Sequence, residues 1–141
     1  MRKVLVIGAA GQIGSELVPA LREKYGNDNV IATGRKTPLP KVICESGPVI
    51  YLDALEKNAF KKVIYEYEIN TVFFMASILS ATGEKMPQTA WDININGLLN
   101  VLEIGRKYNI ERIEQGSDSK YVHAIINHKK KRIENYQRSI W

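Results

Sequence analysis

The chain has 141 residues, about one domain's worth, and its 45% hydrophobic and 25% charged residues are ordinary for a globular protein. That composition argues against disorder, and the single cysteine, Cys44, excludes an internal disulfide and fits a reducing compartment. No apolar run approaches the roughly 20 residues that cross a bilayer, and the chain starts directly on a strand. We therefore expect a cytoplasmic protein without membrane contact.

The first half of the chain predicts two strands joined by a helix, and then a third strand. A short β-branched run at residues 3–7 ends at Gly8 and is typical of a buried strand. Apolar residues then recur at helical spacing as far as Gly26, where the helix is expected to end; they are Ile13, Leu17, Val18, Leu21 and Tyr25. Residues 30–32 and 49–52 predict the next two strands, and the prolines of residues 37–40 predict a loop.

The second half predicts a helix over residues 59–67, a strand over 71–76 and a long helix over 91–108. The long helix is expected to turn five apolar side chains inward, namely Ile95, Leu98, Leu99, Leu102 and Ile104. Alternating strands and helices of this kind predict an α/β fold, a Rossmann-like doubly wound parallel sheet covered by helices on both faces.

The pattern changes after Ile113. A fifth strand is due at residues 111–113, but the polar and turn-like residues 114–119 reduce it to a stub. Residues 121–141 predict a basic amphipathic helix or tail, which carries much of the net charge of +5. We therefore expect a sheet truncated at about the fifth strand, with a folded domain over residues 1–113 and a divergent basic tail over 114–141.

Three glycines, Gly8, Gly11 and Gly14, separate the first strand from the first helix. Gly8 permits a tight turn, Gly11 lets a pyrophosphate approach the backbone, and Gly14 lets the helix pack close to the sheet. The start of the helix adds free N–H groups and partial positive charge. The alternative is a structural turn without a ligand. Because a strand precedes the loop and a helix follows it, the pattern favours an NAD(P)-binding Rossmann domain at residues 1–113.

The end of the second strand bears on the choice of cofactor. Rossmann sites commonly place an acid there to bond the ribose hydroxyls, but residues 33–36 read Thr-Gly-Arg-Lys. Either Arg35 holds a 2′-phosphate, which would favour NADP, or Arg35 and Lys36 are solvated loop charges. Asp53, after the third strand, either accepts a hydrogen bond from an adenine amino group or begins the next helix near Glu56.

Four motifs carry a family resemblance: the glycine loop, Leu-Asp at residues 52–53, Phe-Met-Ala-Ser at 74–77, and Asn-x-x-Gly at 94–97. They resemble the extended short-chain dehydrogenase/reductase superfamily, which includes the NAD-dependent sugar-nucleotide epimerases and dehydratases. Residues 11–19, 29–31, 92–103 and above all 78–84, Ile-Leu-Ser-Ala-Thr-Gly-Glu, are similar to the short-chain type of L-threonine 3-dehydrogenase. The resemblance covers residues 1 to about 113, which correspond to the N-terminal part of that family.

The resemblance implies a role for each matching position. The implied cofactor contacts are Gly8, Gly11, Gln12, Ile13 and Gly14 at the pyrophosphate, Leu52 and Asp53 at the adenine, and Ala76 and Ser77 at the ribose and nicotinamide. Asn94 would orient the cofactor or its helix, and Ser80 would lie near the substrate amino acid.

The chain departs from that family in two ways. The family's acid falls on Gly34, so the resemblance implies NAD while Gly34, Arg35 and Lys36 leave NADP open. The family also uses Tyr-x-x-x-Lys, in which the tyrosine transfers a proton and the lysine lowers the tyrosine's pKa. No tyrosine of this chain has a lysine four residues later, and Ser117 lacks the flanks of the family's serine.

Acid–base catalysis is worth ~10²–10⁴-fold, so we expect the chain alone to be inactive, as the cofactor-binding half of an L-threonine 3-dehydrogenase-like oxidoreductase. The change at Ile113 suggests a truncation, a frameshift or an alternative end to a longer gene. The first alternative is a sugar-nucleotide epimerase or dehydratase relative. The second is a non-catalytic dinucleotide-binding or regulatory module.

Partners follow from the same features. The residues Trp91, Leu98, Leu99 and Leu102 suit a core or a dimer surface. The resemblance implies that this helix packs between two subunits, which would allow a homodimer or pairing with a full-length subunit. His123 and His128 lack the spacing and companions of a metal site. The basic run at residues 129–132 favours a solvated surface, and we do not expect nucleic-acid binding.

Overall fold

The structure is a computed structural model that describes residues 1–76 and 84–116. Five parallel strands form one sheet in the order β3-β2-β1-β4-β5. Their bounds are β1 Val4–Ile7, β2 Val30–Gly34, β3 Val49–Tyr51, β4 Thr71–Phe74 and β5 Arg112–Gln115. The predicted Rossmann-like parallel α/β fold is therefore confirmed.

The sheet reverses its strand order beside β1. From β1 the chain moves outward through β2 to β3, then returns to place β4 on the other side of β1. Val4 is therefore in register with both Val30 of β2 and Thr71 of β4. In open parallel sheets, ligands bind at the carboxyl ends of the strands where the order reverses, and here that position lies above β1 and β4.

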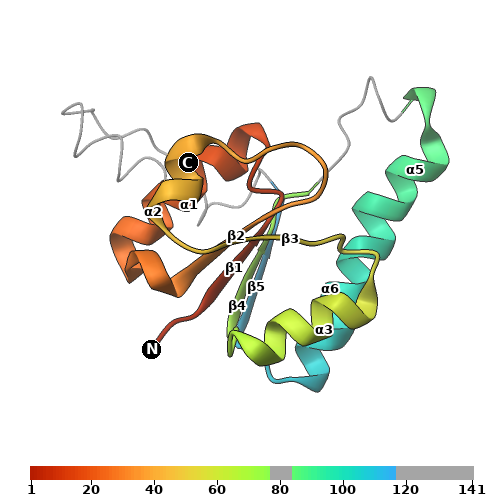
Figure 1. The fold of residues 1–141 in the computed structure, drawn as a ribbon. Coiled ribbons are helices and arrows are strands. Elements are labelled where there is room, and N and C mark those ends of the chain that lie inside the picture. The colour runs from red at the N-terminus through yellow and green to blue at the C-terminus, as the bar shows by residue number, and fades with distance from the viewer. Residues whose placement is uncertain (77–83, 117–141) are drawn as a thin grey trace, which may run out of the picture.

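Helices cover both faces of the sheet, as Figure 1 shows. On one side lie α1 (Gln12–Tyr25) and α2 (Lys41–Ser46), and on the other lie α3 (Lys57–Glu66) and α6 (Gly97–Lys107). Helix α5 (Pro87–Trp91), which buries no residue, extends beyond the sheet. Short 3-10 and π segments cover Asn27–Asn29 and Asp92–Asn96. Within the described residues, no helix combines the length and the apolar character needed to span a bilayer.

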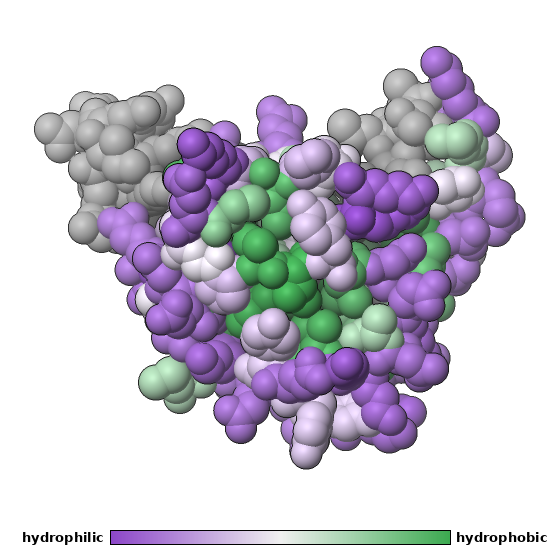
Figure 2. Space-filling model, in the orientation of Figure 1, coloured by the Kyte–Doolittle hydropathy of each residue, from purple (hydrophilic) through white to green (hydrophobic). Residues whose placement is uncertain are grey.

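Side chains alternate along the central strand and feed two separate cores. Val4 and Val6 of β1 pack with α1, α2 and the facing side of β2, while Leu5 and Ile7 pack with α3, α6 and the opposite side. All four residues of β1 are buried. Figure 2 shows hydrophobic residues at the centre of one face, where the sheet lies in Figure 1, flanked by hydrophilic residues.

Helix α2 and strand β5 differ from expectation. Helix α2 was not predicted; it is six residues long and buries only Ile43, so it offers no apolar repeat to detect. Strand β5 is longer than the expected stub and extends through Glu114 and Gln115. Its polar residues are accommodated because Arg112 bonds Glu114 along the strand, with 2.8 Å between nitrogen and oxygen, while the backbone pairs with β4.

The inner side predicted for the long helix was wrong for three residues. The side buried against the sheet carries Gly97, Val101, Ile104 and Gly105, whereas Ile95, Leu99 and Leu102 are 38%, 49% and 46% exposed. Glycines bring the helix close to the strands, since a Cβ on Gly97 would lie 3.1 Å from the Phe74 ring. The π segment Asp92–Asn96 also shifts the helical phase partway along.

A buried arginine ties α1 to the sheet and to α2. Arg22 is 3% exposed, and its Nη1 donates to the Ile43 carbonyl at 2.6 Å and to the Ser46 hydroxyl at 2.7 Å. Its Nη2 donates to the carbonyls of Pro48 at 2.8 Å and Val30 at 3.2 Å. Burial lowers the pKa of this guanidinium below its usual value. The carbonyl oxygens compensate for the lost hydration, so Arg22 holds the edge that carries β2 and β3.

Candidate functional site

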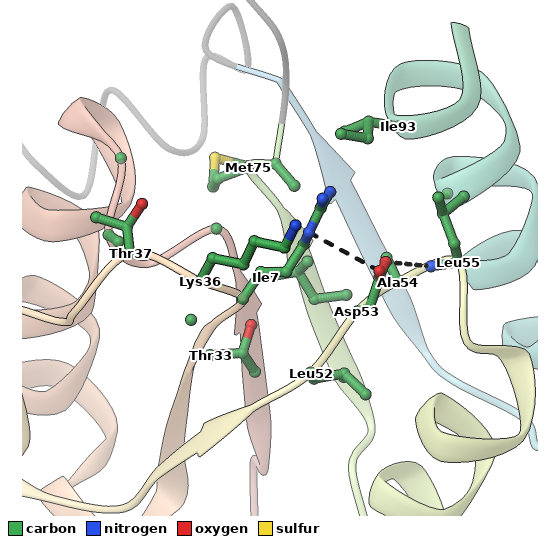
Figure 3. A pocket seen from close by; sticks show the side chains of 17 residues that line it. Ile7, Thr33, Lys36, Thr37, Leu52, Asp53, Ala54, Leu55, Met75 and Ile93 are labelled. Carbon is green, nitrogen blue, oxygen red and sulfur yellow. Dashed lines mark hydrogen bonds and ion pairs between the residues drawn. The ribbon is translucent and has the colours of Figure 1, made fainter. Parts of the chain in front are cut away.

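A pocket lies at the carboxyl ends of β1, β2 and β4, at the position where the strand order reverses. Its volume is about 240 Å³. Figure 3 shows side chains from the strand ends, the loops after them and the long helix around this space. Its described lining residues are Ile7, Gly8, Ala10, Gly11, Thr33, Gly34, Arg35, Lys36, Thr37, Leu52, Asp53, Ala54, Leu55, Met75, Ala76, Ile93 and Gly97.

The three glycines serve distinct purposes. Gly8 has φ +87°, and a Cβ there would lie 2.6 Å from the Ala76 nitrogen at the end of β4. A Cβ on Gly14 would lie 2.8 Å from the Cα of Ala9. Only Gly11 is open, because the nearest atom to its added Cβ is the Gly8 carbonyl oxygen at 3.4 Å. Two glycines are thus required by packing, while the third leaves room in the pocket wall.

Helix α1 begins at this loop with its first N–H groups unclaimed by a capping side chain among the described residues. Gly11 is the N-cap residue, with φ −74° and ψ 171°. The first turn of any α-helix presents N–H groups without intrahelical acceptors, and the helix dipole adds partial positive charge. The combination of this turn with an open Gly11 suits an anionic phosphate.

The end of β2 supplies cations and a buried hydroxyl. Arg35 and Lys36 follow Gly34 along the pocket wall. Thr33 is 1% exposed, and its hydroxyl oxygen is the buried side-chain polar atom without a hydrogen-bond partner in the described part of the chain. Because an unpaired buried hydroxyl destabilises a fold, this oxygen marks a place where a bound polar group would supply the missing hydrogen bond.

A carboxylate from the end of β3 faces those cations. Asp53 Oδ2 lies 3.8 Å from Arg35 Nε, and Asp53 Oδ1 accepts a hydrogen bond from the Leu55 N–H at 2.9 Å. Figure 3 marks both interactions with dashed lines. Both side chains of the ion pair are over a third exposed, so water screens their attraction and Arg35 is readily available to another anion.

Several predicted contacts meet in this pocket. Gly8, Gly11, Arg35, Leu52, Asp53 and Ala76 all line it. Gln12, Ile13 and Gly14 stand behind the loop, in the first turn of α1. Asn94 lies in the π segment between two lining residues, Ile93 and Gly97, and is not itself a lining residue. Ser77 and Ser80 lie outside the described residues, as do His123, His128 and the tail from residue 117.

Sequence reasoning missed several lining residues. Met75 and Ile93 are apolar side chains that a sequence alone would assign to the core, and Thr37 lies in a segment whose prolines predict only a loop. Thr33 gives no signal in the sequence, because the lack of a hydrogen-bond partner for its hydroxyl becomes visible only in the folded structure. Across residues 1–76 and 84–116, no cluster of three or more metal-ligating acids, histidines or cysteines occurs.

A parallel sheet with a glycine turn and a pocket at its reversal point defines the Rossmann-like class of nucleotide-binding domains. The chain matches the model of the NAD dependent epimerase/dehydratase family over residues 4–131. It therefore belongs to that family.

Three similar proteins narrow the comparison. An uncharacterized epimerase/dehydratase from Staphylococcus epidermidis is 42% identical over 111 residues, which cover 79% of this chain and 35% of the relative. The L-threonine dehydrogenase of Clostridium difficile has a TM-score of 0.75 and 44% identity, with 79% of this chain and 35% of that one covered. A GalE-like L-threonine dehydrogenase from Cupriavidus necator, in its holo form, has a TM-score of 0.73 and 42% identity, covering 79% and 36%.

The chain thus spans about a third of the length of these relatives and matches their N-terminal part. Nucleotide binding and an oxidoreductase relationship are supported at this level.

Proposed function

We propose that residues 1–113 bind a nicotinamide dinucleotide, with its pyrophosphate at the loop from Gly8 to Gly14. The observation that carries this proposal is the open position at Gly11, next to the uncapped start of α1 and beside a pocket of about 240 Å³. The residues fit the group, because the uncapped N–H groups at the start of α1 would face phosphate while apolar Ile7, Leu52 and Met75 offer surface to flat rings.

The proposed contacts follow the pocket from one strand end to the next. Gln12 and Ile13 contribute first-turn N–H groups, Leu52 and Asp53 flank the adenine, and Ala76 lies at the nicotinamide side. Ser77 continues that wall, Ser80 contacts the substrate, and Asn94 orients the helix beside the site; these three assignments come from the family resemblance alone.

For a protein of the relatives' length, we propose the reaction of an L-threonine 3-dehydrogenase. The bound nicotinamide would accept hydride from the carbon that bears the substrate hydroxyl. The 44% identity to a threonine dehydrogenase over 79% of this chain supports this reading, as does the stretch at residues 78–84. A sugar-nucleotide epimerase or dehydratase is the alternative, and paired assays with threonine and a UDP-sugar separate the two.

The 141-residue chain by itself is proposed to bind cofactor without turning it over, as a nucleotide-binding module. The general acid–base pair of the family has no counterpart in its sequence, and that pair is worth ~10²–10⁴-fold. Incubation with L-threonine and either cofactor should give no reduced nicotinamide absorbance, while fluorescence titration reports binding. Turnover at the rate of a complete threonine dehydrogenase would refute the proposal.

We further propose that the long helix pairs with a second copy or with a full-length subunit. Trp91, Ile95, Leu99 and Leu102 form a stripe along α5–α6, and Trp91 is 58% exposed. Contiguous exposed apolar side chains of this kind are typical of association surfaces. Figure 1 places this helix at the outer side of the molecule, where a partner could reach it.

The remaining expectations are also proposals. We propose a cytoplasmic location, with which the exposed free thiol of Cys44 is compatible. The residues from 114 onward are proposed as a basic tail that acts as a solvated surface, although β5 continues the folded sheet to Gln115.

A further inference from the structure

The end of β2 carries Gly34 in place of the acid that would bind an unmodified ribose. Three neighbouring residues pack closely around this glycine. A Cβ on Gly34 would lie 3.0 Å from the Tyr51 ring, 3.3 Å from the Leu39 side chain and 3.3 Å from the Thr37 carbonyl. A side chain on residue 34 would press against these neighbours, which would have to give by a few tenths of an ångström. Ribose hydroxyls cannot be recognised there by an acid.

The charged residues that line this end of the pocket are two cations and one carboxylate. Arg35 and Lys36 come from the loop after β2, and Asp53 comes from the end of β3. In Figure 3 the Lys36 side chain extends over the pocket, toward the side on which Asp53 lies. Among the described lining residues the local excess is one positive charge, which attracts a phosphate anion.

A weak ion pair with Asp53 holds Arg35 at the pocket, and a bound phosphate can replace Asp53 in that contact. Its 3.8 Å contact with Asp53 is long and solvent-exposed, and Asp53 keeps the Leu55 N–H at 2.9 Å when Arg35 moves away. An arginine prefers phosphate because its planar group can donate two parallel hydrogen bonds. When Arg35 leaves, Asp53 keeps its Leu55 hydrogen bond and its contact with water, since 34% of its side chain is exposed.

Beneath these charges lies the buried Thr33 hydroxyl, which has no partner among the described residues. Figure 3 shows this hydroxyl pointing from the end of β2 toward the space under Lys36. It is an independent sign of a missing polar ligand, since native structures rarely leave such an atom unpaired.

We propose that this pocket takes a dinucleotide phosphorylated on the ribose 2′ position, NADP rather than NAD, held by Arg35 and Lys36 with the Thr33 hydroxyl bonding the same ribose-phosphate end. The proposal rests on the proposed dinucleotide-binding function. It assigns the choice of cofactor to Arg35, Lys36 and Thr33, whereas the family resemblance implies NAD.

The test is a set of calorimetric titrations of the full chain with NADP, NAD, 2′,5′-ADP and ADP. The expected result is binding of NADP and 2′,5′-ADP at least about 10-fold tighter than of NAD and ADP, with the gap shrinking as salt screens the cations. If NAD and ADP bind as tightly or more tightly, the specificity proposal is wrong. If none of the four binds, the dinucleotide-binding function itself fails.

Three variants sharpen the result. Arg35→Ala and Lys36→Ala should each weaken NADP about 10-fold and leave NAD unchanged. Lys41→Ala removes an exposed cation that lies outside the pocket and should change neither affinity. Thr33→Val should weaken NADP several-fold without lowering the melting temperature of the free protein; unchanged affinity would remove Thr33 from the site.

Discussion

A Cβ on residue 14 would overlap the carbonyl oxygen of Gly8, so Gly14 and Gly8 touch backbone to backbone. This contact brings the first turn of α1 against the end of β1. The distance between helix and strand, and hence the direction of the N–H groups at the start of α1, depends on these two glycines. The loop is thus built by packing before any ligand arrives.

Gly14→Ala should be strongly destabilising, because neither the Gly8 carbonyl nor the Ala9 backbone can move aside cheaply. We expect a loss of about 3 kcal/mol or more in unfolding free energy, which is a drop of roughly 10 °C in melting temperature for a chain of this size. Gly11→Ala is the matched control and should melt within about 2 °C of the parent, since its Cβ meets only one atom, at 3.4 Å. Equal losses in both variants would contradict this division of roles.

Arg22→Met should destabilise the edge of the sheet that carries β2 and β3. The methionine keeps the apolar stem but removes every hydrogen bond to the carbonyls of Val30, Ile43 and Pro48. We expect a cost of about 2–4 kcal/mol, measured by urea denaturation. Arg106→Met removes an exposed arginine and should cost under about 0.5 kcal/mol. A small effect at Arg22 would mean that water replaces the lost donors.

The stripe on the long helix gives a prediction about association. Leu99→Glu places a charge on a half-exposed position without touching the core, so the melting temperature should change little. If a second copy covers the stripe, this variant should be monomeric in sedimentation velocity while the parent is dimeric. Asn58→Glu, at an exposed position on α3, is a control that introduces the same change of charge outside the stripe. A parent that stays monomeric at all concentrations would refute self-association.

An ion pair between α3 and α6 predicts a dependence of stability on pH. Lys57 Nζ donates to Glu103, and this hydrogen bond lowers the pKa of Glu103 from its usual value of 4.5. Because the folded-state pKa is the lower one, the stabilisation is present above about pH 4.5 and is lost as the pH falls through the lowered value. Glu103→Gln should therefore melt slightly below the parent at pH 7 and equal to it near pH 3. A gap that persists at pH 3 would assign the effect to packing.

Much of the fold could be predicted from the sequence because the strands are short runs of apolar residues. Val4 to Ile7 is buried on both faces, and such runs carry a strong signal. The same reasoning could not find α2, whose single buried residue, Ile43, sets no period. It also misjudged Leu99 and Leu102, because periodicity identifies an apolar stripe but does not say whether the sheet or a partner covers it.

The site was partly predictable for a related reason. The glycines and Asp53 stand at fixed places relative to strand ends, so spacing alone brings them together. Spacing could not show that Arg35 lies against Asp53, or that Tyr51 fills the space beside Gly34. Those facts depend on how the loops after β2 and β3 pack against each other, which is a tertiary property.

Cofactor affinity compared between the parent chain and Gly11→Ala tests the central claim most directly. In calorimetric titrations at low salt, the parent should bind NADP or NAD at one site per chain. The variant should keep its melting temperature and lose about 10-fold or more in affinity, because its methyl group stands where the phosphate must approach. No binding of either cofactor by the folded parent, or equal affinity in the variant, would contradict the account.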